Sequence, residues 1–317
     1  MKKLIIIMLF MVAMISLNAE KYAGEIFQIS PGVQNQAMGN TGLTYSSSLA
    51  EGWWNPALLA ISDDNGVEVM RVEHFEGLMQ QNQFSVIFGS KTRTSLQLNH
   101  LGIDKIKLTE LENPDEELSN DNRPQIWKTV SNNDLIFTLG LGRSIKNNLH
   151  LGLSPKLAYR SLAENNGFGI GADLGILWEP LNGFKVGANL RDCFSTQIIW
   201  ENGTYEIALP NLDVEAGYDF SAFSNKIPFH TAFRTQIYAE DRGDASTVSA
   251  GPMSADFHFG MMAQPIPTLK VMAGWDIDSF TAGLGINYKN IGIDYAWVNG
   301  SPDALGSSQR LSLNYKW

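Results

Sequence analysis

The chain has 317 residues, a formal net charge of −10 and one cysteine, Cys193. The acidic balance argues against nucleic acid and anionic phospholipid as partners, because both bind through basic patches. A single cysteine excludes an internal disulfide framework. Only 18% of the residues are charged and 29 are glycine, which is unusual for a secreted soluble protein.

The first 19 residues have the pattern of a cleavable secretory signal. Lys2 and Lys3 form a basic start, residues 4–15 are an apolar run, and Ala19 stands at the expected cleavage position. The run is too short for a spanning helix. We therefore expect an exported mature chain that begins at residue 20, with a net charge of −12 once the two lysines are removed.

From about residue 66 to the end, apolar residues recur at every second position, which is the period of a β-strand. No helical period competes with this alternation over a comparable length. The pattern predicts fourteen strands, near residues 66–74, 82–90, 92–101, 134–143, 149–160, 167–178, 184–192, 211–220, 229–239, 254–263, 269–276, 279–288, 291–298 and 309–317.

The lengths of the connections decide between a soluble sandwich and a membrane barrel. Four connections are long and follow odd-numbered strands, at residues 102–133, 193–210, 240–253 and 299–308. Long loops on one rim and short turns on the other are typical of bacterial outer-membrane barrels, whereas a sandwich gives no reason for them. We therefore predict an all-β fold in which residues 66–317 form an antiparallel transmembrane β-barrel in the outer membrane.

Aromatic residues near the strand ends support this prediction. Trp178 and Trp317 fall at the short-turn rim, and Trp275 and Trp297 fall near the long-loop rim. Indole rings favour the headgroup level, so two belts are expected. The last strand, with Leu313, Tyr315 and Trp317 on its apolar face, resembles the C-terminal assembly signal of outer-membrane barrels. The expected partners are thus outer-membrane lipid and the barrel-assembly machinery.

Residues 20–65 do not alternate and are dominated by small residues and turn formers. In front of a barrel, such a segment is best explained as a hatch that plugs the lumen. Its sequence Ala37-Met38-Gly39-Asn40-Thr41-Gly42, followed by Trp54-Asn55-Pro56-Ala57-Leu58-Leu59-Ala60, resembles the N-terminal signature of the PorV/PorQ family, which belongs to the FadL-like group of outer-membrane barrels. Thr41 and Leu58 depart from the usual pattern, which has Ala and Gly at these two places.

The resemblance implies a fourteen-stranded barrel whose lumen holds the Asn-Pro-Ala turn. Pro56 fixes one backbone angle and restricts Asn55 to extended geometry, while the Asn55 amide can satisfy loose backbone groups. The motif is therefore expected to hold the hatch rather than to contact a substrate; its residues are Met38, Gly39, Trp54, Asn55, Pro56 and Ala57. We also expect Gly167, Gly169 and Gly171 to let the hatch backbone approach the wall.

The sequence contains no enzymatic, cofactor or metal motif. The five histidines have no zinc-ligand spacing, and three of them, His100, His230 and His258, are expected to face the lumen in satisfied polar roles. An acidic run at residues 110–117 matches no calcium loop, and a solvated run is the favoured interpretation over divalent-ion bridging.

Three functions remain, and the third is a structural or general-porin role. The first is a PorV-like role, in which long outer loops present the barrel to secretion-system or cargo proteins in protein export or surface attachment. The second is FadL-like transport of small hydrophobic ligands, which needs an apolar pocket in the lumen near the outer rim. The inward faces are polar and rich in glycine, with charges such as Lys185, Arg191, Arg234, Asp213 and Glu215. This composition favours the protein-partner role, and a general porin is disfavoured by the hatch.

Overall fold

A computed structural model describes residues 24–45, 48–63, 65–89, 92–224, 226–300 and 306–317. The expected signal peptide lies outside these residues. No helix among them is long and apolar enough to cross a membrane.

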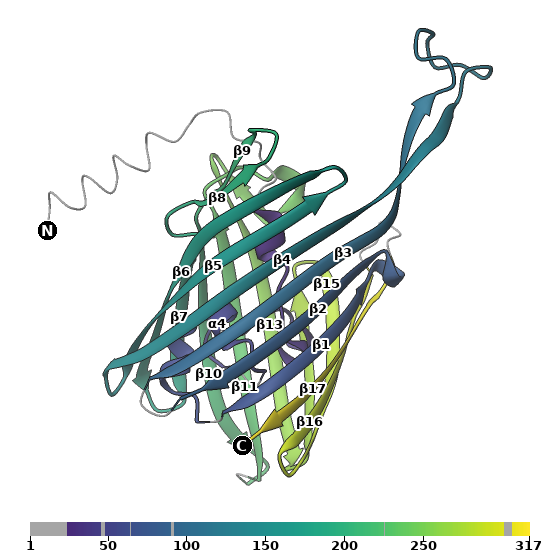
Figure 1. The fold of residues 1–317 in the computed structure, drawn as a ribbon. Helices are drawn as coiled ribbons and strands as arrows, with labels where there is room; N and C mark the ends of the chain where they lie inside the picture. The colour runs from purple at the N-terminus through teal and green to yellow at the C-terminus, as the bar shows by residue number, and fades with distance from the viewer. Residues whose placement is uncertain (1–23, 46–47, 64, 90–91, 225, 301–305) are drawn as a thin grey trace, which may run out of the picture.

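The wall is a closed antiparallel sheet (Figure 1). Its first and last strands pair with each other over Gly66–Glu73 and Gln309–Lys316. The fourteen wall strands are β1 (Gly66–His74), β2 (Met79–Phe88), β3 (Arg93–Leu111), β4 (Pro124–Lys146), β5 (Leu149–Leu162), β6 (Asn165–Leu181), β7 (Phe184–Arg191), β10 (Asn211–Ala222), β11 (Ile227–Tyr238), β13 (Met253–Ile266), β14 (Leu269–Asp276), β15 (Ser279–Tyr288), β16 (Ile291–Val298) and β17 (Ser308–Lys316). The predicted closed fourteen-stranded barrel is confirmed.

Side chains alternate across this wall in the opposite sense to a soluble protein. Phe84, Leu98 and Ile293 are exposed on the outer face, whereas Gln97 and Asp294, on the inner face, are buried. An apolar outside and a polar inside suit a wall that meets lipid, and closure leaves no unpaired sheet edge in the hydrocarbon. The chain is thus an outer-membrane protein, with its short turns on the periplasmic side.

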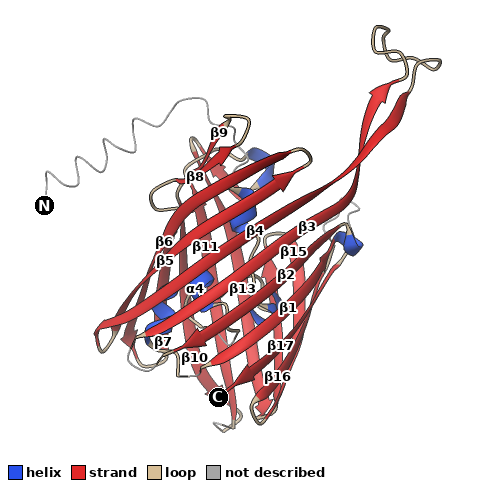
Figure 2. Ribbon diagram, viewed as in Figure 1, coloured by secondary structure: helices blue, strands red, loops and turns tan. Residues whose placement is uncertain are grey.

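Two predicted loops contain more strand than expected. β3 and β4 extend far beyond the barrel as a two-stranded ribbon, so that only 112–123 of the predicted loop 102–133 is a loop (Figure 2). The alternation failed to show this because register shifts between Ile103 and Ile106, and between Leu108 and Thr109, break its period. The loop 193–210 contains a hairpin of β8 (Thr196–Trp200) and β9 (Tyr205–Ala208), and β8 pairs with the outer half of β6.

The N-terminal segment lies inside the barrel (Figures 1 and 2). Four short helices form it, α2 (Glu25–Gln28), α3 (Val33–Ala37), α4 (Glu51–Trp54) and the 3-10 helix η1 (Pro56–Ala60). We call the described residues of this segment, 24–45 and 48–63, the hatch. Three minor elements lie in the outer connections, η2 (Phe75–Gly77), η3 (Gly243–Ala245) and β12 (Val248–Ala250).

Candidate functional site

The Asn55-Pro56-Ala57 turn is fastened to the wall at β5 and β6. Asn55 is extended and fully buried; its side-chain oxygen accepts a hydrogen bond from the Ala57 N–H at 3.1 Å. Its amide donates to the carbonyls of Leu43, at 2.8 Å, and Ile176, at 3.0 Å. One side chain therefore joins two parts of the hatch to each other and to the wall.

Wall glycines provide the space for this turn. A Cβ atom at Gly152 would lie 2.2 Å from the carbonyl carbon of Pro56, and one at Gly175 would lie 2.2 Å from the Asn55 side-chain oxygen. Backbone approach of this kind requires glycine. The expectation that Gly167, Gly169 and Gly171 would play this role is wrong, because a Cβ atom at each would meet β8 side chains, namely those of Trp200, Ile198 and Thr196.

Met38 and Gly39 contact the opposite side of the wall, at β13 to β15. Gly39 has φ +65°, and its N–H donates to the Thr281 hydroxyl, at 2.9 Å. Cβ atoms at Gly260 and Gly274 would lie 2.2 Å from the Met38 oxygen and the Gly39 nitrogen. Thr41, which departs from the family pattern, donates its hydroxyl to the Met38 carbonyl at 2.8 Å and closes this turn.

A buried carboxylate, Glu215, binds the middle of the hatch. It accepts hydrogen bonds from three successive backbone N–H groups, those of Gly42, Leu43 and Thr44, at 2.8 to 2.9 Å, and from the Thr44 hydroxyl at 2.6 Å. Successive N–H groups that converge on one anion form a nest. The sequence showed Glu215 as an inward charge but gave no sign of this partner, because the contact spans 171 residues.

Two arginines continue the attachment around Asp213. Arg191 donates to the Asp213 carboxylate at 2.6 Å and Arg234 donates to its other oxygen at 3.0 Å. Both guanidinium groups also contact the hatch: Arg191 lies 3.8 Å from the centre of the Trp53 ring, and Arg234 lies 5.3 Å from that of Trp54. Both arginines therefore attach the hatch to the wall, while Asp213 holds the two guanidinium groups in place.

The outer end of the lumen is apolar. Eight buried side chains pack there where α2 meets the outer halves of three wall strands and the β8–β9 hairpin, and they are Ile26, Phe27, Leu101, Ile136, Ala158, Ile198, Trp200 and Ala208. We call them the outer apolar cluster. At its border the Lys156 ammonium lies 4.7 Å from the Phe27 ring centre and pairs with Asp173, at 2.8 Å, and Asp192, at 2.6 Å. Sequence reasoning missed this cluster because its members come from six separate elements.

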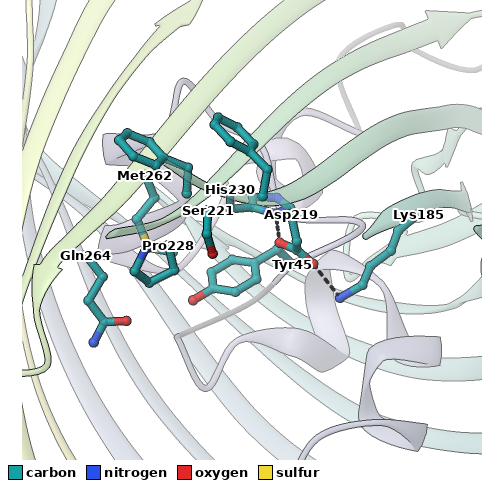
Figure 3. A pocket seen from close by; sticks show the side chains of 10 residues that line it. Tyr45, Lys185, Asp219, Ser221, Pro228, His230, Met262 and Gln264 are labelled. Atoms are coloured by element: carbon teal, nitrogen blue, oxygen red, sulfur yellow. Dashed lines mark hydrogen bonds and ion pairs between the residues drawn. The ribbon is translucent and has the colours of Figure 1, made fainter. Parts of the chain in front are cut away.

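The inner end of the lumen contains a cavity of about 380 Å³ beside Tyr45 of the hatch. Figure 3 shows Lys185 and His230 converging on the Asp219 carboxylate, at 3.1 and 2.7 Å. The Tyr45 ring stacks on the His230 ring, with centroids 4.5 Å apart. Met262 and Pro228 add apolar surface, while Ser221 and Gln264 add polar groups. The cavity lies at the short-turn rim and so faces the periplasm.

Two of the three histidines expected in the lumen lie there: His230 bonds Asp219 at 2.7 Å and His258 bonds Asp276 at 2.9 Å. The expectation for His100 is wrong, because its position on β3 has the parity of exposed Leu98, which places its ring on the outer face, where it bonds Asn133 at 3.0 Å. Within the described parts of the chain, no group of three His, Cys, Asp or Glu side chains is placed to hold a metal ion.

The C-terminal residues lie on the outer face of the closing strand. Leu313, Tyr315 and Trp317 are each about half exposed, and the rings of Tyr315 and Trp317 stack at 5.9 Å. Leu313 stands between Ile293 of β16 and Val69 of β1. These residues therefore line the seam of the barrel, and their role in assembly stays a prediction.

Comparisons with known proteins show the fold group. No family model matches the chain, and no curated protein matches it by sequence. Among solved structures, the toluene transporter TodX of Pseudomonas putida matches with a TM-score of 0.58 at 14% identity, over 90% of this chain and 98% of that one. The Ralstonia pickettii toluene transporter TbuX gives 0.56 at 11%, over 90% and 97%.

A Pseudomonas aeruginosa FadL homologue matches with a TM-score of 0.51 at 10% identity, over 91% of this chain and 98% of that one. The FadL-like part of the resemblance is therefore supported at the level of fold. The narrower PorV/PorQ resemblance stays a prediction.

Proposed function

We propose that this protein carries small hydrophobic compounds across the outer membrane. The outer apolar cluster is the observation that supports the proposal. A transporter of this class needs apolar surface in the lumen near the outer rim, and eight buried apolar side chains gather at that place. An apolar compound that binds there is stabilised by roughly 25 cal/mol for each Å² of apolar surface that is removed from water.

In this proposal the hatch excludes ions and sugars from the pathway. It touches the wall at β5, β6, β13 and β14, and Glu215, Arg234 and Asn55 hold it in between. Free flow of ions and sugars is not compatible with a plug held in this way. The inner cavity beside Tyr45 then offers a second space for a compound, on the periplasmic side of the hatch.

The protein-export role, which the inward polarity had favoured, has less support. Three of the inward charges, Arg191, Arg234 and Glu215, bind the hatch, so their polarity does not argue against an apolar ligand. The toluene transporters that the fold resembles also point to the transport role.

A polar substitution in α2 tests the proposal. Phe27→Asn places an amide in the outer apolar cluster, whereas the control Leu58→Asn makes a similar change in the buried inner part of the hatch. We expect Phe27→Asn to lower the uptake of labelled toluene by cells that express the protein about tenfold, the equivalent of about 1.4 kcal/mol, while Leu58→Asn retains uptake. Equal uptake in wild type and Phe27→Asn, at equal amounts of folded barrel, would refute the role of this cluster.

A further inference from the structure

The ribbon formed by the ends of β3 and β4 stands free of the barrel (Figure 1). β3 leaves its neighbour β2 after Gly102, and β4 pairs with β5 only from Asn132 onward. Between these points the two strands pair only with each other, from Ile106 opposite Val130 to Leu111 opposite Pro124. We call residues 103–131 the arm. Both of its long edges are unpaired over most of their length.

The tip of the arm is a built structure. The Asn122 side chain is only 3% exposed although it lies at the far end of the ribbon. Its oxygen accepts from the Asn113 N–H at 2.9 Å, and its amide donates to the carbonyls of Asn113, at 2.9 Å, and Glu116, at 3.1 Å. The tip therefore presents its side chains in fixed positions.

The two edges of the arm differ in chemistry. The β3 edge carries Lys105, Lys107 and Glu110, and charged residues are the usual protection of an open edge. The β4 edge, residues 125–131, reads Gln-Ile-Trp-Lys-Thr-Val-Ser, with mostly β-branched or aromatic residues. Its one charge, Lys128, pairs with Glu164 at the β5–β6 turn. Ile126 and Trp127 are 55% and 54% exposed. This edge has the composition of a strand that lacks its neighbour.

A two-stranded hairpin alone in water is only marginally stable, and pairing with a third strand stabilises it. The charge of the tip indicates what kind of strand fits. Residues 110–121 contain six acids and no base, namely Glu110, Glu112, Asp115, Glu116, Glu117 and Asp121. A second copy of this chain in the same membrane would place an identical acidic tip alongside, and like charges repel. A basic partner removes this repulsion.

We propose that the arm is a docking site at which a basic, extended segment of an extracellular protein adds as a third strand along β4. Backbone hydrogen bonds to the open edge supply affinity in this mode, and the flanking charges select the partner. This inference is independent of the transported compound, because no residue of the arm belongs to the outer apolar cluster or the inner cavity.

Three synthetic peptides test the proposal on the full-length protein in detergent. The first alternates Lys and Val over eight residues, the second is the same peptide with alternate backbone nitrogens methylated, and the third alternates Glu and Val. We expect the Lys-Val peptide to bind, and the methylated and acidic peptides to bind at least about tenfold more weakly, because strand addition needs backbone donors and opposite charge.

Variants locate the binding. Replacement of residues 103–132 by a two-residue turn, which joins Gly102 to its cross-strand partner Asn133, should abolish binding of the Lys-Val peptide and leave the barrel folded. Neutralising Asp115, Glu116 and Glu117 should weaken it about tenfold. The matched control neutralises three acids of other outer loops, Asp241, Asp244 and Asp278. This control should leave the binding of the Lys-Val peptide unchanged. Undiminished binding to the arm-less protein, or equal binding of the methylated or acidic peptide, would overturn the proposal.

Discussion

At the scale of single residues, the lumen is specialised for holding the hatch. Glu215 illustrates this, since all its hydrogen bonds go to hatch groups at residues 42–44. Glu215→Gln keeps the shape but leaves fewer acceptors for three buried N–H groups. We expect this change to destabilise the binding of the hatch to the wall by about 1–3 kcal/mol. A loosened hatch should raise the ion conductance of the protein in planar bilayers, which is the measurement.

The same substitution at an exposed site is the control for this prediction. Glu112→Gln changes a solvent-exposed carboxylate on the arm and should not alter conductance. A Glu215→Gln barrel that stays as silent as the wild type would show that the nest does not hold the hatch.

A glycine of the wall gives a second test at this scale. Gly152→Ala would place a methyl group 2.2 Å from the Pro56 carbonyl carbon, so the hatch must shift, whereas at Gly102 the nearest atom to a new methyl group is 3.3 Å away. We expect Gly152→Ala, but not Gly102→Ala, to make the hatch accessible to added protease. Identical cleavage patterns for the two variants would contradict the close contact.

At the scale of elements, the hatch should be separable from the wall. Replacing Asn55-Pro56 with Ala-Ala removes the amide that joins Leu43 to Ile176, and the proline that begins η1. The fourteen strands close without the motif, so we expect a folded but leaky barrel. Higher small-solute conductance and sensitivity to bulky antibiotics would measure the leak. A double variant with wild-type conductance would show that this motif is not what seats the hatch.

The last strand is the second element with a testable role. Replacing Tyr315 and Trp317 with Ser removes two stacked rings from the outer face of β17, the strand that closes the barrel against β1. We expect less folded protein in the outer membrane, measured as the heat-modifiable band on gels, because aromatics stabilise the interface there. The same exchange at exposed Tyr205, in the β8–β9 hairpin, is the control. Unchanged assembly would mean that these rings are not an assembly signal.

At this scale the sequence predicted the wall well and the contents of the lumen poorly. Four strands, β1, β14, β15 and β16, have the predicted bounds, because alternation is a local property of the chain. The arm was missed where bulges break that period. The contacts of Glu215 and the outer apolar cluster were missed because they join segments far apart in the sequence, and only closure of the barrel brings them together.

At the scale of the whole molecule, the polarity of the interior has a different meaning from the one its composition suggested. Charged inward residues first indicated an interior that avoids apolar compounds. Asp213, Arg191 and Arg234 instead bind one another and the hatch, and apolar side chains gather at the outer end. The molecule is an outer-membrane barrel whose N-terminal segment lies in the lumen, with a buried apolar cluster at the outer end and a cavity at the inner end.

The most direct test of this account compares two solutes in one preparation. Liposomes that contain the folded wild-type protein should take up labelled toluene faster than liposomes without it, while a labelled sugar of similar size enters both at the same rate. We expect this selectivity because we infer that the hatch blocks the aqueous path and that the outer apolar cluster receives the apolar compound. Sugar entry that matches toluene entry, or toluene entry that the protein does not accelerate, would contradict it.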